Sequence, residues 1–146
     1  MDKTQNRRLH FDNDDAEKYE EFGKKQTPFK KLAYIDLFSI ALVYGRDRGK
    51  RTKLKKEGST IGRVVESVID NSDLRYLMKA IAVDVENSLN AVLDVDKYFL
   101  ISEEYAKTGL EYFYEDFINN KNLLDDMEEE LHDFYLEHEE ELHDFN

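Results

Sequence analysis

The sequence has no cysteine and few residues that interrupt helices. Among its 146 residues there are one proline and six glycines. The absence of cysteine excludes disulfide bonds and thiolate metal sites, and it fits a reducing compartment. The scarcity of proline and glycine leaves few turns, which favours helices over a β fold built from many short strands.

Long hydrophobic runs are also lacking. The start of the chain, MDKTQNRRLHFDNDD, has no apolar core of a signal peptide. The longest apolar-rich run, LAYIDLFSIALVYG, contains Asp36 and is shorter than the ~20 residues that a membrane span needs. We therefore expect a cytoplasmic protein with no membrane partner. The length favours one domain, and nine Phe and nine Tyr supply material for its core.

Positive charge is scarce except in one short segment. The formal net charge is −12, from 33 acidic and 21 basic residues. Residues 46–56, RDRGKRTKLKK, hold seven cations and one acid, 7 − 1 = +6, which leaves −12 − 6 = −18 for the rest. Such segregation indicates a segment that meets an anion, and nucleic-acid phosphate is the leading candidate. The overall negative charge opposes general nucleic-acid binding, so any contact would be local and salt-sensitive.

Apolar spacing predicts the first helices. Residues 14–22 can form a short helix that Gly23 ends. Thr27 and Pro28 suit the start of a second helix, which is apolar on most sides through Val43 and has Gly45 where a C-terminal cap would fall. Residues 61–69 have spacing that is more helical than alternating, although their β-branched content leaves a strand open.

The second half continues the helical pattern. Residues 74–85 form an amphipathic helix, and Asp96 can cap another that runs to Ile118. Gly109 inside it signals close packing or a break. We predict a mainly α fold, a compact helical domain with an acidic C-terminal amphipathic helix. Its parts are a flexible N-terminus (residues 1–13), a helical domain (14–118) and an acidic helical tail (119–146).

The tail contains an internal repeat. EEELHDF occurs at residues 128–134 and again at 139–145, an offset of eleven residues or about three helical turns. His and carboxylate side chains four residues apart would suit a divalent cation, but exposed Glu–His pairs are common on solvated helices, and we assign no metal site. The repeat aligns an apolar stripe whose members are candidates for partner binding: Leu131, Phe134, Leu142 and Phe145.

The basic segment follows the buried helix directly, so a rigid body is expected to present it as a loop. Its cations would contact phosphates, the glycines would allow close approach, and Tyr44 could stack on a base. Alternatively, Arg46 and Arg48 complement the helix dipole, which does not explain the five cations downstream, or the segment remains solvated or docks on the acidic tail or an acidic partner. The segment lacks the spacing of a Walker loop. The candidates for nucleic-acid binding are Tyr44, Arg46, Arg48, Lys50, Arg51, Lys53, Lys55 and Lys56.

The sequence offers little for catalysis. Glu103 and Glu104 are adjacent carboxylates, but neighbours on a helix point about 100° apart and do not make an obvious acid–base pair. No catalytic triad or cysteine nucleophile is evident. We assign no catalytic residue and no cofactor.

One stretch, residues 38–112, carries a family pattern. An apolar helix leads into a Gly-x-x-x-Gly-Lys-Arg segment, then an Ala-Ile-Ala helix, then Glu-Glu-Tyr-Ala followed by Gly-Leu. The matching positions are Tyr44, Gly45, Gly49, Lys50 and Arg51; Ala80, Ile81 and Ala82; and Glu103, Glu104, Tyr105, Ala106, Gly109 and Leu110. The pattern resembles the Dnd system-associated proteins, which are encoded beside the genes for DNA phosphorothioation and its restriction partners. The resemblance implies a helical accessory protein of a DNA-modification or defence system, with no catalytic residues carried over.

Two hypotheses follow. The first is a non-enzymatic accessory protein of such a system that contacts DNA, or a partner protein of the system, through residues 46–56. The alternative is a protein-interaction adaptor or homodimer that uses the acidic tail and binds no nucleic acid. A third, a DNA mimic, is weaker because the basic segment interrupts a uniformly negative surface.

Overall fold

A computed structural model describes residues 7–24, 29–55, 60–119 and 123–143. Within these ranges the chain is mainly α-helical, as the sequence predicts, and it also contains one two-stranded sheet. The elements are, in order, β1 (Arg8–Asp12), the 3-10 turn η1 (Asn13–Asp15), α1 (Ala16–Lys24), α2 (Tyr34–Arg48), β2 (Thr60–Val65), α3 (Glu66–Asp70), α4 (Leu74–Glu86), the 3-10 turn η2 (Leu89–Leu93), α5 (Val95–Tyr114), the π-helical turn η3 (Glu115–Asn119), α6 (Leu123–Glu137) and α7 (Glu139–His143).

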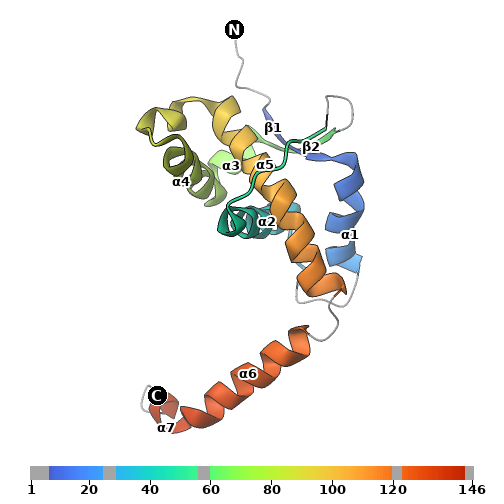
Figure 1. Ribbon diagram of the computed structural model, residues 1–146, viewed down its shortest axis with the longest axis vertical. Coiled ribbons are helices and arrows are strands. Elements are labelled where there is room, and N and C mark those ends of the chain that lie inside the picture. Colours follow the sequence, from blue (N-terminus) through green and yellow to red (C-terminus); the bar gives the residue numbers. More distant parts are fainter. Residues whose placement is uncertain (1–6, 25–28, 56–59, 120–122, 144–146) are drawn as a thin grey trace.

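The core is organised around α5. Figure 1 shows this helix standing between α4 and α1, with the sheet near its start. Most of its side chains are buried, and Phe99 and Phe113 are fully covered. Phe113 stacks on Phe22 of α1 with ring centroids 4.1 Å apart, and Phe38 of α2 is buried in the same core. Aromatic pairs in such an arrangement stabilise the core beyond the effect of the apolar area that they bury.

Two glycines let α2 and α5 cross at close range. A Cβ on Gly45 would lie 1.8 Å from the carbonyl oxygen of Tyr105, and a Cβ on Gly109 would lie 1.7 Å from the carbonyl oxygen of Ala41. Because both obstacles are backbone atoms, no side-chain rotation could make room. Gly109 therefore marks close helix packing, one of the two outcomes that the sequence predicts.

The bounds of α2 correct two predictions. The helix begins at Tyr34, where Asp36 accepts a hydrogen bond from the N–H of Ala33 at 3.1 Å; Thr27 and Pro28 lie outside the described residues. Gly45 does not end the helix, because it is buried against α5 and the helix continues to Arg48. Gly49 provides the cap instead, with a φ of 66° in the left-handed region that favours glycine.

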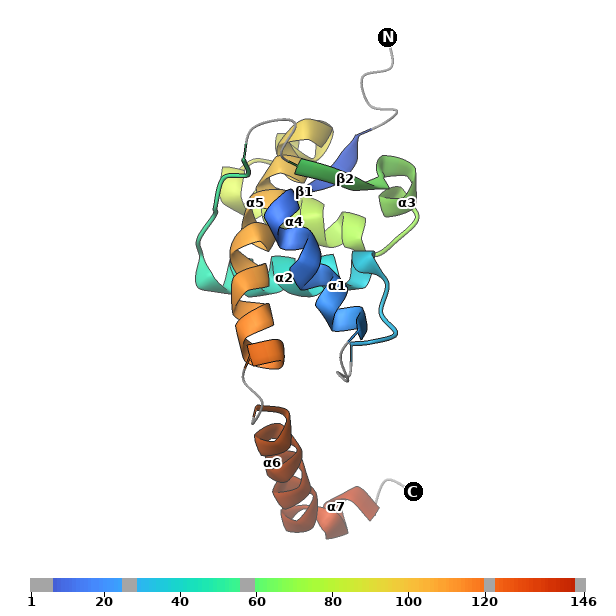
Figure 2. The same cartoon turned by 90° about the vertical axis from the view of Figure 1, so that its right-hand side faces the viewer.

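The sequence left a strand open at residues 61–69 but did not predict β1 or a sheet. Residues 8–12 fall in the expected flexible N-terminus, yet they form β1, which pairs antiparallel with β2 and buries Leu9 and Phe11. The helical spacing of residues 61–69 predicted the wrong structure for residues 61–65, which form strand β2 with their β-branched side chains. Helix α3 begins only at Glu66. Figure 2 shows the two strands lying across the top of the helical body.

The remaining helices lie close to their predicted positions. α1 passes through Gly23 and includes Lys24. α4 matches its prediction to within one residue. α5 is capped by Asp94, whose carboxylate accepts from the N–H of Lys97 at 3.1 Å, so Asp96 lies in the first turn and is not the cap. None of the helices described combines the length and apolarity needed to cross a membrane.

Candidate nucleic-acid interface

The basic segment is an extended strap that is packed on the helical body. Residues 50–55, here named the strap, run beside α5 after the cap at Gly49, as Figures 1 and 2 show. Thr52 donates its N–H to the carbonyl oxygen of Glu104 at 3.1 Å, and the hydroxyls of Thr52 and Thr108 lie 2.7 Å apart. Near its end, Lys55 donates its N–H to the Asp12 carboxylate at 2.7 Å. The expected loop is therefore held against the helical body through the backbone N–H groups of Thr52 and Lys55.

Three of the predicted phosphate contacts are ion-paired within the protein. Arg46 pairs with Asp84 and lies over the ring of Tyr105. Arg51 binds Glu104 through two nitrogens, at 2.9 Å and 2.7 Å from the same oxygen. Lys55 pairs with Asp14.

The other cations face solvent. Arg48, Lys50 and Lys53 are exposed and form no ion pair with any residue in the described ranges. Lys56 lies outside those ranges. The Arg48 guanidinium lies 4.2 Å from the ring centroid of Tyr112, which is itself partly exposed. At this distance the ring attracts the guanidinium and helps to hold it in place. These three residues are the free cations of the segment.

Tyr44 does not belong to this exposed surface. Its side chain is half-buried between α2 and α5, 5.5 Å from the ring of Phe113, and its hydroxyl donates to Asp116 at 3.1 Å. Burial, together with that hydrogen bond, raises the pKa of Tyr44 to about 12. The side chain contributes to helix packing, so base stacking by Tyr44 would require it to leave the core. Tyr112, which sequence analysis did not single out, is the exposed aromatic beside the cations.

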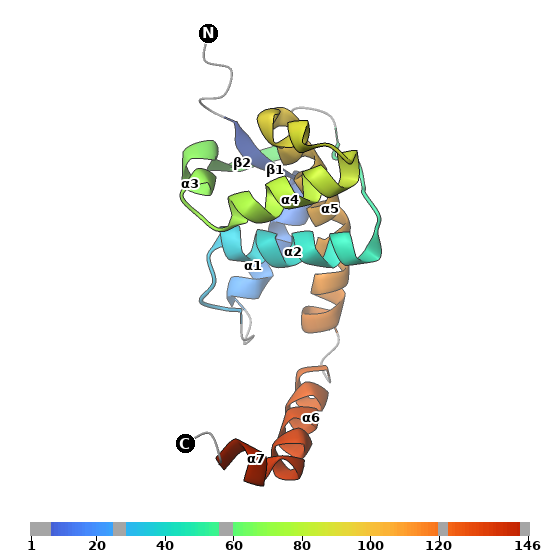
Figure 3. The ribbon, with the colours of Figure 1, turned by 90° about the vertical axis from the view of Figure 1, so that its left-hand side faces the viewer.

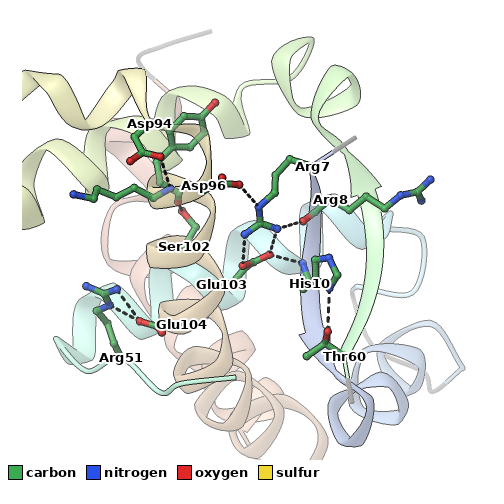
Figure 4. A network of polar contacts seen from close by, with 12 residues as sticks. Arg7, Arg8, His10, Arg51, Thr60, Asp94, Asp96, Ser102, Glu103 and Glu104 are labelled. Atoms are coloured by element: carbon green, nitrogen blue, oxygen red, sulfur yellow. Dashed lines mark hydrogen bonds and ion pairs between the residues drawn. The ribbon is translucent and has the colours of Figure 1, made fainter. Parts of the chain in front are cut away.

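Buried carboxylates anchor the strap and β1 to α5. Figure 4 shows Glu103 directed toward Arg7 and β1, and Glu104 directed toward Arg51. The two Arg7–Glu103 hydrogen bonds are 3.1 Å and 2.9 Å long, and the N–H of His10 donates to the same carboxylate at 2.6 Å. Burial raises the pKa of Glu103 although Arg7 opposes the shift. The adjacent carboxylates thus serve different partners and do not share one reaction site.

A second anchor lies one turn further along α5. Lys107 reaches Asp12 at 3.0 Å and Asp15 at 2.8 Å, and both carboxylates are buried. Burial alone would lower the pKa of Lys107, but the hydrogen bonds to the two carboxylates outweigh it and raise the pKa. Asp12 binds Lys107 with one oxygen and the backbone of Lys55 with the other. The strap, β1 and α5 are therefore joined in one rigid polar network.

A groove of about 460 Å³ lies between β1, the strap and α5. Its lining includes three cations, a hydroxyl and two buried carboxylates, from Arg7, Lys53, Lys55, Thr60, Glu103 and Glu104. The hydroxyl of Thr60 is 3.0 Å from Nδ1 of His10. Among the residues described there is no cluster of three His, Asp or Glu side chains placed to hold a metal ion.

The net negative charge is concentrated away from this interface. Residues 119–146 hold eleven acids and one lysine, 1 − 11 = −10, so residues 1–118 carry −12 + 10 = −2. Figure 3 shows α6 and α7 extending below the helical body and away from the sheet. The strap is thus carried by a nearly neutral body, and most of the repulsion toward phosphate originates in the tail.

Comparison with known proteins places the chain in a family. No curated protein and no solved structure matches it. One family model, DNA sulphur modification system-associated protein 4, matches residues 8–146, which includes the sheet, the helical body and the acidic helices. The match extends well beyond the residues that carried the resemblance in sequence, and it covers far more than half of the chain. This protein therefore belongs to the family of DNA sulphur modification system-associated protein 4.

Proposed function

We propose that this protein is a non-enzymatic accessory component of a DNA sulphur modification system that contacts the DNA backbone through Arg48, Lys50 and Lys53. Membership of the family supports the association with such a system. The DNA contact is supported chiefly by one observation: these three cations are exposed on a rigid support, while their neighbours in the segment are ion-paired internally.

The geometry suits phosphate better than base recognition. Lys50 and Lys53 flank Arg51 and Thr52, which tie the extended strap to α5, and Arg48 is the last residue of α2. The three free cations are therefore displayed on backbone that has little freedom to rearrange. Lysine and arginine contacts of this kind fix a protein on the duplex without selecting a sequence. We therefore expect salt-sensitive binding with weak sequence preference.

The proposed role is non-enzymatic because the acid–base side chains around the groove have structural partners. The acid–base groups around the groove are engaged in contacts that stabilise the fold: Glu103 with Arg7, Glu104 with Arg51, and His10 with Thr60. A general acid or base must be able to reach a substrate proton, and these groups would have to give up structural contacts to do so.

Matched double variants test the DNA contact. Lys50→Ala with Lys53→Ala removes two free cations from the strap. Lys30→Ala with Lys31→Ala removes two exposed cations that precede α2, at the other end of a helix of about 22 Å. Both change the net charge from −12 to −12 − 2 = −14. In low-salt gel shifts with duplex DNA, we expect the first to weaken binding about tenfold or more and the second far less.

The proposal fails if the wild-type protein does not bind DNA at low salt, or if the two double variants weaken binding equally. Equal effects would mean that only the net charge of the protein matters. Thermal unfolding of each variant should match the wild type, because exposed lysines away from buried contacts rarely change stability by more than about 0.5 kcal/mol.

A further inference from the structure

The last residue of α2 and the last turn of α5 form an exposed aromatic–cation pair. Tyr112 is 39% exposed, although most side chains of α5 are buried. The guanidinium carbon of Arg48 lies 4.2 Å from the centroid of its ring, and Arg48 is itself exposed. Arginine at this distance stacks on an aromatic face. The pair, here named the platform, therefore presents planar groups to solvent.

The platform lies at one end of the row of side chains that fixes the strap. Glu104, Thr108 and Tyr112 follow one another at intervals of four residues, so they share one face of α5. Glu104 and Thr108 hold Thr52 by its N–H and its hydroxyl, and Tyr112 lies beneath Arg48. The chain from Arg48 to Thr52 therefore follows this face of α5, as the course of the strap beside α5 in Figure 1 illustrates.

The charges around the platform favour a different contact from those on the strap. Lys50 and Lys53 follow Arg48 by two and five residues, a stretch of at most about 18 Å when extended. The neighbours of the platform in sequence include the exposed acids Asp47 and Glu111. These acids disfavour a phosphate at the ring, whereas the strap attracts one. The arrangement suits a nucleic-acid strand whose phosphates follow the strap and whose base reaches the ring.

Only an unpaired base can use such a platform. Bases stack on aromatic rings and on the guanidinium planes of arginine alike, so both members of the platform can take part. In a duplex the bases are paired and stacked on one another, and a base must leave that stack before a protein side chain can reach its face. Proteins that bind single strands combine a cationic track with aromatic side chains in this way.

We propose that the strap binds single-stranded DNA in preference to duplex DNA, with an unpaired base stacked on Tyr112 and Arg48. The adjoining phosphates contact Lys50 and Lys53. This inference rests on the proposed DNA contact and names the form of DNA that the same site takes. Stacking on a ring tolerates any base, so the sequence preference stays weak. The stacking role considered for Tyr44 in the sequence belongs instead to the exposed Tyr112.

Oligonucleotides with and without bases test the platform on the unaltered full-length protein. The probes are a fluorescein-labelled thymidine strand, an abasic strand of the same length, and the duplex of the thymidine strand with its complement. In fluorescence anisotropy at low salt, the thymidine strand should bind about tenfold more tightly than the abasic strand and about fivefold more tightly than the duplex. Equal affinity for the two single strands, or a duplex that binds as tightly as the thymidine strand, would overturn the proposal.

A matched pair of variants locates the contact. Tyr76 also lies beneath an arginine, Arg75, at 4.4 Å and is 59% exposed. It stands in the first turn of α4, at the opposite end from the Asp84 that pairs with Arg46. Tyr112→Leu should weaken binding of the thymidine strand about tenfold, whereas Tyr76→Leu should leave it within about twofold. Tyr112→Phe keeps the ring and should bind like the wild type.

Salt dependence separates this proposal from the proposed function. Tyr112→Leu removes no phosphate contact, so the salt slope for the thymidine strand should stay unchanged. Lys50→Ala with Lys53→Ala should make that slope shallower by about 1.4, at about 0.7 for each contact to a single strand.

The outcomes distinguish the two proposals. If the lysine variant weakens binding but Tyr112→Leu and Tyr76→Leu have equal effects, the platform is wrong and the phosphate contact stands. If no DNA binds, or the lysine variant binds like the wild type, the proposed function fails and the platform fails with it. Thermal unfolding checks each variant, and the abasic comparison decides the proposal without any substitution should Tyr112→Leu fail to fold.

Discussion

Adding one methyl group at Gly109 should destabilise the protein even though alanine is the better helix former. The new Cβ would lie 1.7 Å from the carbonyl oxygen of Ala41 and 2.4 Å from the backbone nitrogen of Gly45. A normal contact requires more than 3 Å, so α2 and α5 must separate by about 1.5 Å at their crossing. That separation disturbs packing throughout the core that the two helices share.

Gly109→Ala has two opposing effects on the free energy of unfolding, a gain in helix propensity and a loss from overpacking. Replacing glycine by alanine inside a helix gains about 1 kcal/mol, whereas overpacking costs typically 1–3 kcal/mol and more when the obstacle is rigid. Since both obstacles at Gly109 are backbone atoms, we take the upper end of that range. The expected net loss for Gly109→Ala is about 2 kcal/mol in the free energy of unfolding.

Gly23→Ala is the matched control. It makes the same chemical change in α1, but a Cβ at Gly23 would meet no atom within 4 Å. It should therefore raise the free energy of unfolding by up to about 1 kcal/mol. Urea denaturation followed by circular dichroism measures both variants. A Gly109→Ala protein as stable as the wild type would refute the close crossing of α2 and α5.

Three further outcomes follow from the polar network and the tail. Glu103→Gln should lower the free energy of unfolding by about 2 kcal/mol, because Arg7 loses its buried charged partner and keeps only the exposed Asp96. Glu111→Gln, an exposed change on the same helix, should have little effect in the same urea series. The pKa of Lys107 is raised above 10.5 in the folded state, so the stability from its ion pairs is complete below about pH 10.5 and is lost as the pH rises through the raised pKa. Lys107→Met should flatten that alkaline decline in thermal melts recorded against pH, and an unchanged decline would contradict the assignment. Ending the chain after Asn119 removes a charge of −10 and should tighten low-salt DNA binding roughly tenfold, an effect that shrinks as salt is added.

Local patterns identified the helices but not how they meet. The apolar spacing of α4 and α5 was sufficient to place both, because amphipathic periodicity is a property of the segment itself. The end of α2 could not be placed, since the choice between Gly45 and Gly49 depends on Gly109, more than sixty residues away in the sequence. The strand β1 likewise forms only because β2 and α5 lie beside it.

At the candidate site, too, the sequence predicted the segment but not its contacts with residues distant in sequence. Composition alone located the basic segment, and that location still carries the proposed function. Which cations are free could not be inferred, because Arg46, Arg51 and Lys55 are paired with acids distant in sequence. Arg48, Lys50 and Lys53 remain from the predicted set within the described residues, and the exposed Tyr112 joins them. In the predicted tail stripe, the exposed Leu131 and Phe134 are described, while the side chain of Leu142 and the whole of Phe145 lie outside the described part.

The salt dependence of DNA binding tests the central claim most directly, because its slope counts phosphate contacts. The logarithm of the binding constant falls linearly with the logarithm of salt concentration, with a slope of about −0.9 for each contact to duplex DNA. If Lys50 and Lys53 touch phosphates, removing both should make the slope shallower by about 2, while removing Lys30 and Lys31 should leave it unchanged. A slope that changes equally in both variants, or in neither, would contradict a DNA interface on the strap.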